Sequence, residues 1–167
     1  VLQEIREKLG HAVFGSGADE LHDVVRQCLA AQQLTVALAE GTTTGGLLSH
    51  WLSREDDREA PVLHSDRLIP AGEDTENLVE FCRSIQQDAD FAVVTSHSRV
   101  SSEDGGSTIK TGRFAVTGAG LSRVVDVDFA GDLGIFRERA ARMALNLIRL
   151  HLNGHTAERA AAGRDAR

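Results

Sequence analysis

The residues best suited to chemistry lie in one short segment, Glu40 to Gly46, which reads Glu-Gly-Thr-Thr-Thr-Gly-Gly. An alternating apolar run, 34–39, precedes it, and an amphipathic pattern follows it. This order predicts a strand, a turn, and a helix that begins near Thr44. A helix N-terminus offers unpaired N–H groups and the positive end of the helix dipole, which suit a phosphate or an oxyanion. We therefore expect a small anionic ligand at this turn.

The candidate ligand contacts in this segment are Glu40, Gly41, Thr43, Thr44, Gly45 and Gly46. The segment is not a P-loop, because no Gly-Lys-Ser/Thr follows it. It is not a dinucleotide-binding fingerprint either, because the three spaced glycines are missing. A purely structural interpretation also fits: Gly41 permits a tight turn and a threonine caps the helix.

Length, charge and composition exclude several classes of function. A chain of 167 residues suits one domain, and its net charge of −7 argues against a nucleic-acid partner. No apolar run is long enough for a membrane span. The histidines are scattered and there is no CxxC, so we expect no metal and no cofactor. Cys28 and Cys82 fall on apolar helix faces, which predicts buried free thiols and fits a cytoplasmic location.

Periodicity predicts the elements. Helices are expected at about 1–9, 19–32, 44–54, 75–87 and 135–152, and extended segments at 34–39, 61–69, 91–95, 110–117 and 121–129. Residues 55–59 and 96–107 are expected to be loops, and Gly154 is expected to end the last helix. Helices flank the first three strands and a hairpin precedes the last helix, which predicts a single-domain α/β fold, a three-layer α/β/α sandwich with a mixed β-sheet.

Three segments carry a resemblance to a known family. They are 39–46, which resembles the signature Ala-Glu-Ser-Cys-Thr-Gly-Gly, the strand 89–95, and Gly131-Asp132 with the helix 137–147. Over about 5–152 the chain resembles, as a divergent member, the C-terminal domain of the competence/damage-inducible protein CinA. That resemblance implies a domain at 1–153, with 1–17 as a helix and linker from a longer chain, and a tail at 154–167. It also implies a nicotinamide-nucleotide amidase, which hydrolyses nicotinamide mononucleotide to nicotinate mononucleotide and ammonia.

The resemblance also implies a catalytic set. In the family a signature Ser is the nucleophile, assisted by a Tyr and a Lys from a Val-x-Tyr-Ser-Asn-x-x-Lys segment. Here the Ser falls on Thr42 or, in the other alignment, on Gly41. The second segment falls near 62–69, which holds neither Tyr nor Lys. The remaining catalytic candidates are Thr42 with His64, or His97, as its base. Arg67 and Arg99 are candidate phosphate ligands, and Thr95 begins the third family loop.

Two functions from different classes remain open. The first is an amidase-type domain with altered catalytic residues. The second is a non-catalytic nucleotide-binding or oligomerisation scaffold of a CinA-like protein. In either case we expect a homo-oligomer and a small anionic, nucleotide-like ligand, and we expect neither a nucleic acid nor a membrane as partner.

Overall fold

The computed structural model describes residues 20–53, 62–73, 76–102 and 108–162. In chain order the elements are α2 (Leu21–Ala31), β1 (Val36–Glu40), α3 (Leu47–Leu52), β2 (Leu63–Leu68), α4 (Leu78–Gln86), β3 (Phe91–Thr95), β4 (Arg99–Ser102), β5 (Thr108–Gly118), β6 (Leu121–Ala130) and α5 (Leu133–Ala162). The expected helix at 1–9 and the charged loop at 55–59 lie outside the described residues.

The strands form one mixed sheet. β1 is flanked by β2 and β3, and it pairs in parallel with both. β5 is antiparallel to its neighbours: β3 and β4 pair with different parts of it along one side, and β6 pairs with it along the other. β1 and β3 are buried along their whole length, which explains why both read as nearly continuous apolar runs.

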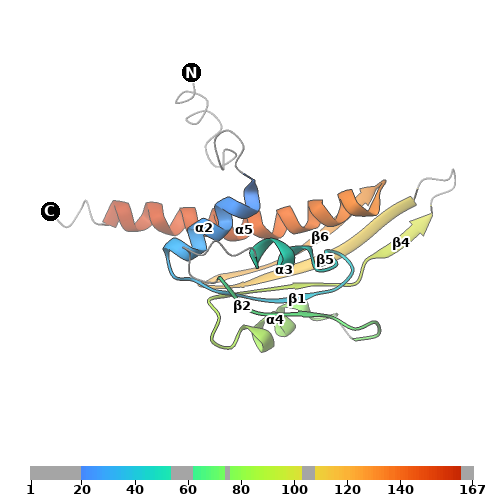
Figure 1. Cartoon of the computed structure of the whole chain (residues 1–167), viewed down its shortest axis with the longest axis horizontal. Helices are drawn as coiled ribbons and strands as arrows, with labels where there is room; N and C mark the ends of the chain where they lie inside the picture. Colours follow the sequence, from blue (N-terminus) through green and yellow to red (C-terminus); the bar gives the residue numbers. More distant parts are fainter. Residues whose placement is uncertain (1–19, 54–61, 74–75, 103–107, 163–167) are drawn as a thin grey trace, which may run out of the picture.

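Helices cover both faces of this sheet (Figure 1). α2, α3 and α5 lie on one face and α4 lies on the other. Alternate side chains of β1 divide between the two cores: Val36 and Leu38 join the cluster under α5, while Ala37 and Ala39 join the cluster under α4. The predicted three-layer sandwich with a mixed sheet in a single domain is confirmed.

Three predicted boundaries are wrong. The helix expected at 44–54 begins at Leu47 rather than near Thr44. The segment 96–107 is not all loop, because β4 pairs with β5 there despite its polar composition. The last helix passes through Gly154 and runs to Ala162, since one glycine inside a helix costs only about 1 kcal/mol relative to alanine. Within the described part of the chain, no helix combines the length and apolar character that a membrane crossing needs.

Candidate functional site

The signature-like turn leaves β1 at Glu40 and enters α3 at Leu47. Gly45 and Gly46 have φ angles of 63° and 88°, a left-handed conformation that favours glycine, so the helix cannot include them. Gly46 is the N-cap residue, with no side-chain cap bond. The expectation that a threonine caps this helix is therefore wrong.

The side chain of Glu40 takes the place of the cap. Its carboxylate accepts the backbone N–H of Leu48 at 3.1 Å and that of Ser49 at 2.8 Å. It also accepts the Ser49 hydroxyl at 2.6 Å, and Glu40 is only 1% exposed. The anion at the start of α3 is thus the chain's own carboxylate, and these amides are not the unpaired groups that the sequence predicted.

Other amides of the turn are paired as well. Gly41 N–H donates to the backbone oxygen and the hydroxyl of Thr95, and Thr43 N–H donates to the Ser96 carbonyl. The amides of Thr44 and Gly45 return to the carbonyl of Gly41. The turn is therefore a folded unit fixed to the end of β3.

Three of the predicted contact threonines hold this unit together. Thr43, Thr44 and Thr95 are buried. The Thr44 and Thr95 hydroxyl oxygens lie 2.9 Å apart, and the Thr43 hydroxyl lies 3.3 Å from that of Ser96. Glu40 and Gly41 are also buried. In this structure these residues position the turn, and its exposed members are Thr42 and Gly45.

Thr42 contacts residues on two other elements. Its Oγ1 accepts the Ser98 N–H at 2.8 Å and lies 3.0 Å from the Ser98 hydroxyl. Its carbonyl accepts the Nε–H of Arg137, from the first turns of α5, at 3.2 Å. Sequence reasoning did not single out Ser98 or Arg137, although Arg137 opens the helix segment that carries the family resemblance.

His97 lies beside Thr42, but both of its ring nitrogens are engaged. Nδ1 accepts the Thr42 backbone N–H at 3.4 Å, and Nε2 lies 3.1 Å from the carbonyl of Pro70. A carbonyl can only accept, so Nε2 carries the proton and Nδ1 is the acceptor for the amide. In this tautomer both ring nitrogens are hydrogen-bonded to backbone groups.

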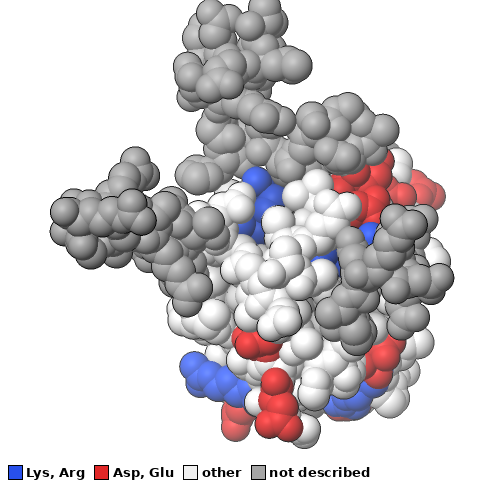
Figure 2. Space-filling model, turned by 60° about the vertical axis from the view of Figure 1, so that its left-hand side comes forward, with Lys and Arg blue, Asp and Glu red and all other residues white. Residues whose placement is uncertain are grey.

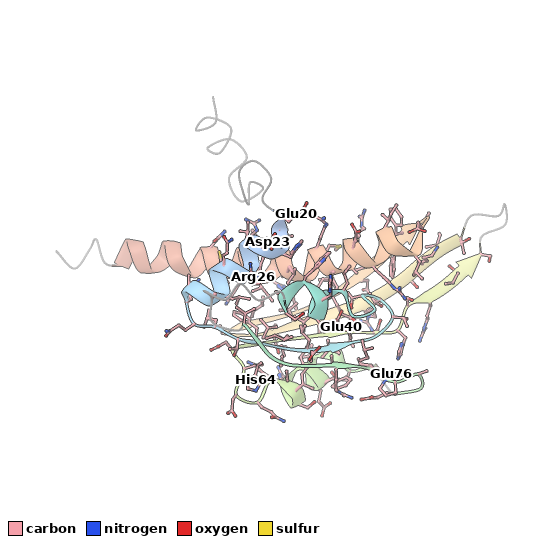
Figure 3. The ribbon with its side chains drawn as sticks, viewed as in Figure 1. Glu20, Asp23, Arg26, Glu40, His64 and Glu76 are labelled. Carbon is pink, nitrogen blue, oxygen red and sulfur yellow. The ribbon has the colours of Figure 1, made fainter. Side chains whose placement is uncertain are left out.

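His64 is not brought to Thr42. It lies near the start of β2, where Leu63 pairs with Val36 and Ser65 with Ala37, whereas Thr42 follows the end of β1. At about 3.3 Å per residue, His64 is more than about 10 Å away along the strand. Figure 3 shows His64 at the far end of β2 from Glu40, which lies beneath α3.

At the end of β2, an apolar side chain lies where the family resemblance would put the Lys. In the segment Val62 to Ile69, the eighth position corresponds to the Lys of Val-x-Tyr-Ser-Asn-x-x-Lys, and it is Ile69. Ile69 is 5% exposed and packs in the cluster that includes Leu78 and Cys82. Its N–H donates to the Glu40 carbonyl at 2.8 Å, so it lies directly beside the turn.

A cavity of about 830 Å³ opens next to this site. It lies between the segment that joins β3 to β4, the segment before α4, and the faces of β5 and β6. Its walls are formed by Gly72, Glu73, Glu76, Ser96, His97, Arg99, Thr111, Gly112, Arg113, Asp126, Val127 and Asp128. Arg99 is the one predicted ligand residue among these walls. Arg67 instead pairs with Glu73 at 2.8 Å and stacks over the Phe81 ring.

The cavity carries both signs of charge. Arg113 pairs with Asp126 at 2.8 Å, and the Arg99 side chain is exposed. Sequence reasoning missed Arg113, because only the β5–β6 register brings it into line with Asp126. Within the described residues, no group of three or more His, Cys, Asp or Glu side chains could hold a metal ion.

Known structures share this fold. A competence or damage-inducible protein from Enterobacter asburiae superposes with a TM-score of 0.62 at 20% identity, covering 83% of this chain and 99% of that one. A CinA superfamily protein from Escherichia coli gives 0.60 at 20% identity, with coverage of 85% and 98%. At this level of identity these likenesses show the fold alone. No family model matches the chain.

Relatives found by sequence are named CinA-like proteins. A CinA-like protein from Syntrophomonas wolfei is 27% identical over 171 residues, which is 90% of this chain and 41% of the relative. Another from Kosmotoga olearia is 26% identical over 168 residues, with coverage of 88% and 40%. These comparisons support a CinA-like domain. A CinA-like protein from Dictyoglomus thermophilum reaches 43% identity over 49 residues, 29% of this domain and 12% of that protein. The domain thus spans less than half the length of these relatives.

Proposed function

We propose that this CinA-like domain binds a nucleotide-like ligand of the nicotinamide mononucleotide type without hydrolysing its amide. The observation that carries the proposal is Ile69, a buried apolar side chain where the resemblance puts the lysine that assists the nucleophile. A hydroxyl attacks an amide only when a base takes its proton. At this position the domain has no group to do so.

The contacts of Thr42 support the same conclusion. Its hydroxyl oxygen accepts an amide N–H from Ser98, and the second hydroxyl beside it is that of Ser98, which is no base at neutral pH. His97, which lies beside Thr42, has its acceptor nitrogen on a backbone amide rather than on the hydroxyl. His64 is too far away along β2. The methyl group of Thr42 further restricts the approach of a substrate.

Binding is supported by the adjoining cavity. Its volume lies within the range of small-molecule sites, about 300–1,000 Å³. Nicotinamide mononucleotide carries a cationic pyridinium ring and an anionic phosphate. A cavity with carboxylates at Asp126 and Asp128 and a guanidinium at Arg99 can complement both charges. In this proposal Arg99 holds the phosphate.

Two measurements test the proposal. In the first, the protein is incubated with nicotinamide mononucleotide and ammonia release is followed for the wild type and for Thr42→Ala. We expect both to release ammonia at the uncatalysed rate. Release by the wild type that Thr42→Ala abolishes would overturn the non-hydrolytic assignment.

The second measurement is calorimetric titration with nicotinamide mononucleotide. Wild-type binding is expected, and Arg99→Ala should weaken it by about tenfold or more, the value of one charge-assisted hydrogen bond. Arg139→Ala is the matched control, because Arg139 is an exposed arginine of α5 on the other face of the sheet, and it should leave affinity unchanged. Absence of wild-type binding would reject the ligand and leave the oligomerisation scaffold as the function.

A further inference from the structure

The last strand of the sheet, β6, has a neighbouring strand on one side only among the described residues. It pairs with β5 through ten consecutive residue pairs, from Leu121 opposite Gly118 to Ala130 opposite Ile109, and with no other strand among the described residues. Ten residues is long for an edge strand, because natural proteins usually keep exposed edges short or blocked. β6 lies at the border of the sheet under α5 (Figure 1).

The hairpin geometry shows which backbone groups point outward. Ala119 and Gly120 have φ angles of 48° and 85° and form a two-residue turn, so Gly118 and Leu121 are a hydrogen-bonded pair. Odd-numbered residues of β6 therefore direct their N–H and C=O groups to β5. Even-numbered residues direct theirs away from the sheet, and these are Ser122, Val124, Asp126, Asp128 and Ala130.

Side chains of β6 add apolar surface to this edge. Val124 is 40% exposed on the α4 side of the sheet. Leu121, Val125 and Phe129 are half-buried on the α5 side, where they only partly join the core. The opposite edge differs, because four consecutive residues of β2, 64–67, are polar and exposed. β6 therefore has both the backbone groups and the apolar contacts that a further strand requires.

We propose that β6 pairs antiparallel with β6 of a second copy of this chain, about a two-fold axis at Val125, to form one continuous sheet. In this register Leu121 of one copy faces Phe129 of the other, and Val125 faces Val125. On the α4 side, Ser122 faces Asp128 and Val124 faces Asp126. No two like charges are opposed, and the backbone groups of Ser122, Val124, Asp126 and Asp128 all meet hydrogen-bonding partners.

Neighbouring registers are less favourable. In a symmetric pair of strands, side chains that face one another must lie on the same face of the sheet. The two-fold axis must therefore pass through a residue, and the nearest alternatives to Val125 are Val124 and Asp126. An axis at Asp126 would place its carboxylate directly against its own copy, which like-charge repulsion disfavours. An axis at Val124 would place Phe129 opposite the turn residue Ala119 and lose the apolar pairing with Leu121. The side chains that face one another are therefore most compatible when the two-fold axis passes through Val125.

The first experiment measures the mass of the 167-residue protein by light scattering or sedimentation at micromolar concentration. The wild type should be a dimer. Val124→Pro should be a monomer, because it deletes an outward N–H and places the proline ring between the two strands, while costing no bond to β5. Val124→Thr keeps the N–H and should remain a dimer. A monomeric wild type, or a dimer that survives Val124→Pro with its circular dichroism intact, would overturn the proposal.

A second experiment tests the register without disturbing the backbone. Facing residues of a non-hydrogen-bonded antiparallel pair have Cα atoms about 4.5 Å apart, within the range that a disulfide bridges. In a Cys28→Ser background, mild oxidation should link Val125→Cys into a covalent dimer. Val127→Cys, which faces Arg123 of the second copy, should not link. Crosslinking of Val127→Cys in preference to Val125→Cys would reject this register.

Discussion

The carboxylate of Glu40 and the first turn of α3 meet at Ser49, whose hydroxyl lies 2.6 Å and whose backbone nitrogen lies 2.8 Å from the same carboxylate oxygen. This contact joins the end of β1 to a helix of only six residues. An isolated helix of that length is not stable in water. We infer that the buried carboxylate, rather than helix propensity, sets the place where α3 begins.

Removing this carboxylate should destabilise the domain. Glu40→Ala leaves the amides of Leu48 and Ser49 buried without their acceptor, so we expect the free energy of unfolding to fall by about 3 kcal/mol, since hydrogen bonds to charged groups are each worth about 1.5–3 kcal/mol. Urea unfolding followed by the fluorescence of Trp51, the single and largely buried tryptophan, measures this change.

Ser49→Ala provides the matched control. It removes only the hydroxyl contact and should cost about 1 kcal/mol. If Glu40→Ala were no more destabilising than Ser49→Ala, the carboxylate would not be the element that fixes the helix start. Glu40→Gln should fall between the two, because its amide keeps one acceptor oxygen but loses the charge.

A second close contact links the turn to β5. A Cβ added at Gly112 would lie 2.3 Å from Thr43 Oγ1 and 2.8 Å from its Cγ2, so the threonine side chain occupies the space above the glycine. Gly112→Ala should therefore destabilise by about 1–3 kcal/mol, the usual cost of overpacking. Thr43→Ala removes both clashing atoms, and we expect the double variant Thr43→Ala/Gly112→Ala to be more stable than Gly112→Ala alone.

A double-mutant cycle in urea checks this coupling. The interaction energy between the two substitutions should be at least about 0.5 kcal/mol, as is typical of residues in contact. Strictly additive effects would show that Gly112 is needed for a reason other than the room it leaves for Thr43.

Several features of the fold could be predicted from the sequence, because local pattern and burial agree there. Leu21, Val25 and Leu29 are spaced for one helix face and are all buried, and Phe91 to Val94 form a continuous apolar run inside the sheet. Alternation along the hairpin also agrees with burial: Ser122, Asp126 and Asp128 are exposed, whereas Val127 is buried. Each of these features depends on residues close together in the chain.

The candidate site was harder to predict because its contacts are distant in sequence. Glu40 was expected to serve a ligand, and nothing local indicates that its carboxylate turns back onto residues 48 and 49. Arg137 reaches Thr42 across 95 positions, and Ser98 reaches it across 56. His64 and Thr42 looked compatible by residue type, but strand register separates them. Gly45 and Gly46 were expected to be part of the helix, because hydrophobic periodicity does not reveal that a residue has a positive φ angle.

Burial raises the pKa of the Cys82 thiol from 9.0 to about 12, which predicts a loss of stability at alkaline pH. Between these two values the unfolded chain loses the Cys82 proton while the folded domain keeps it, so the unfolded state binds fewer protons and the free energy of unfolding decreases as pH rises. The contribution is fully present below pH 9 and falls by about 1.4 kcal/mol per pH unit above it. Cys82→Ala removes this group, so urea unfolding of the wild type between pH 8 and 10.5 should show the steeper decline. Parallel declines would mean that the Cys82 thiol ionises as readily in the folded domain as in the unfolded chain.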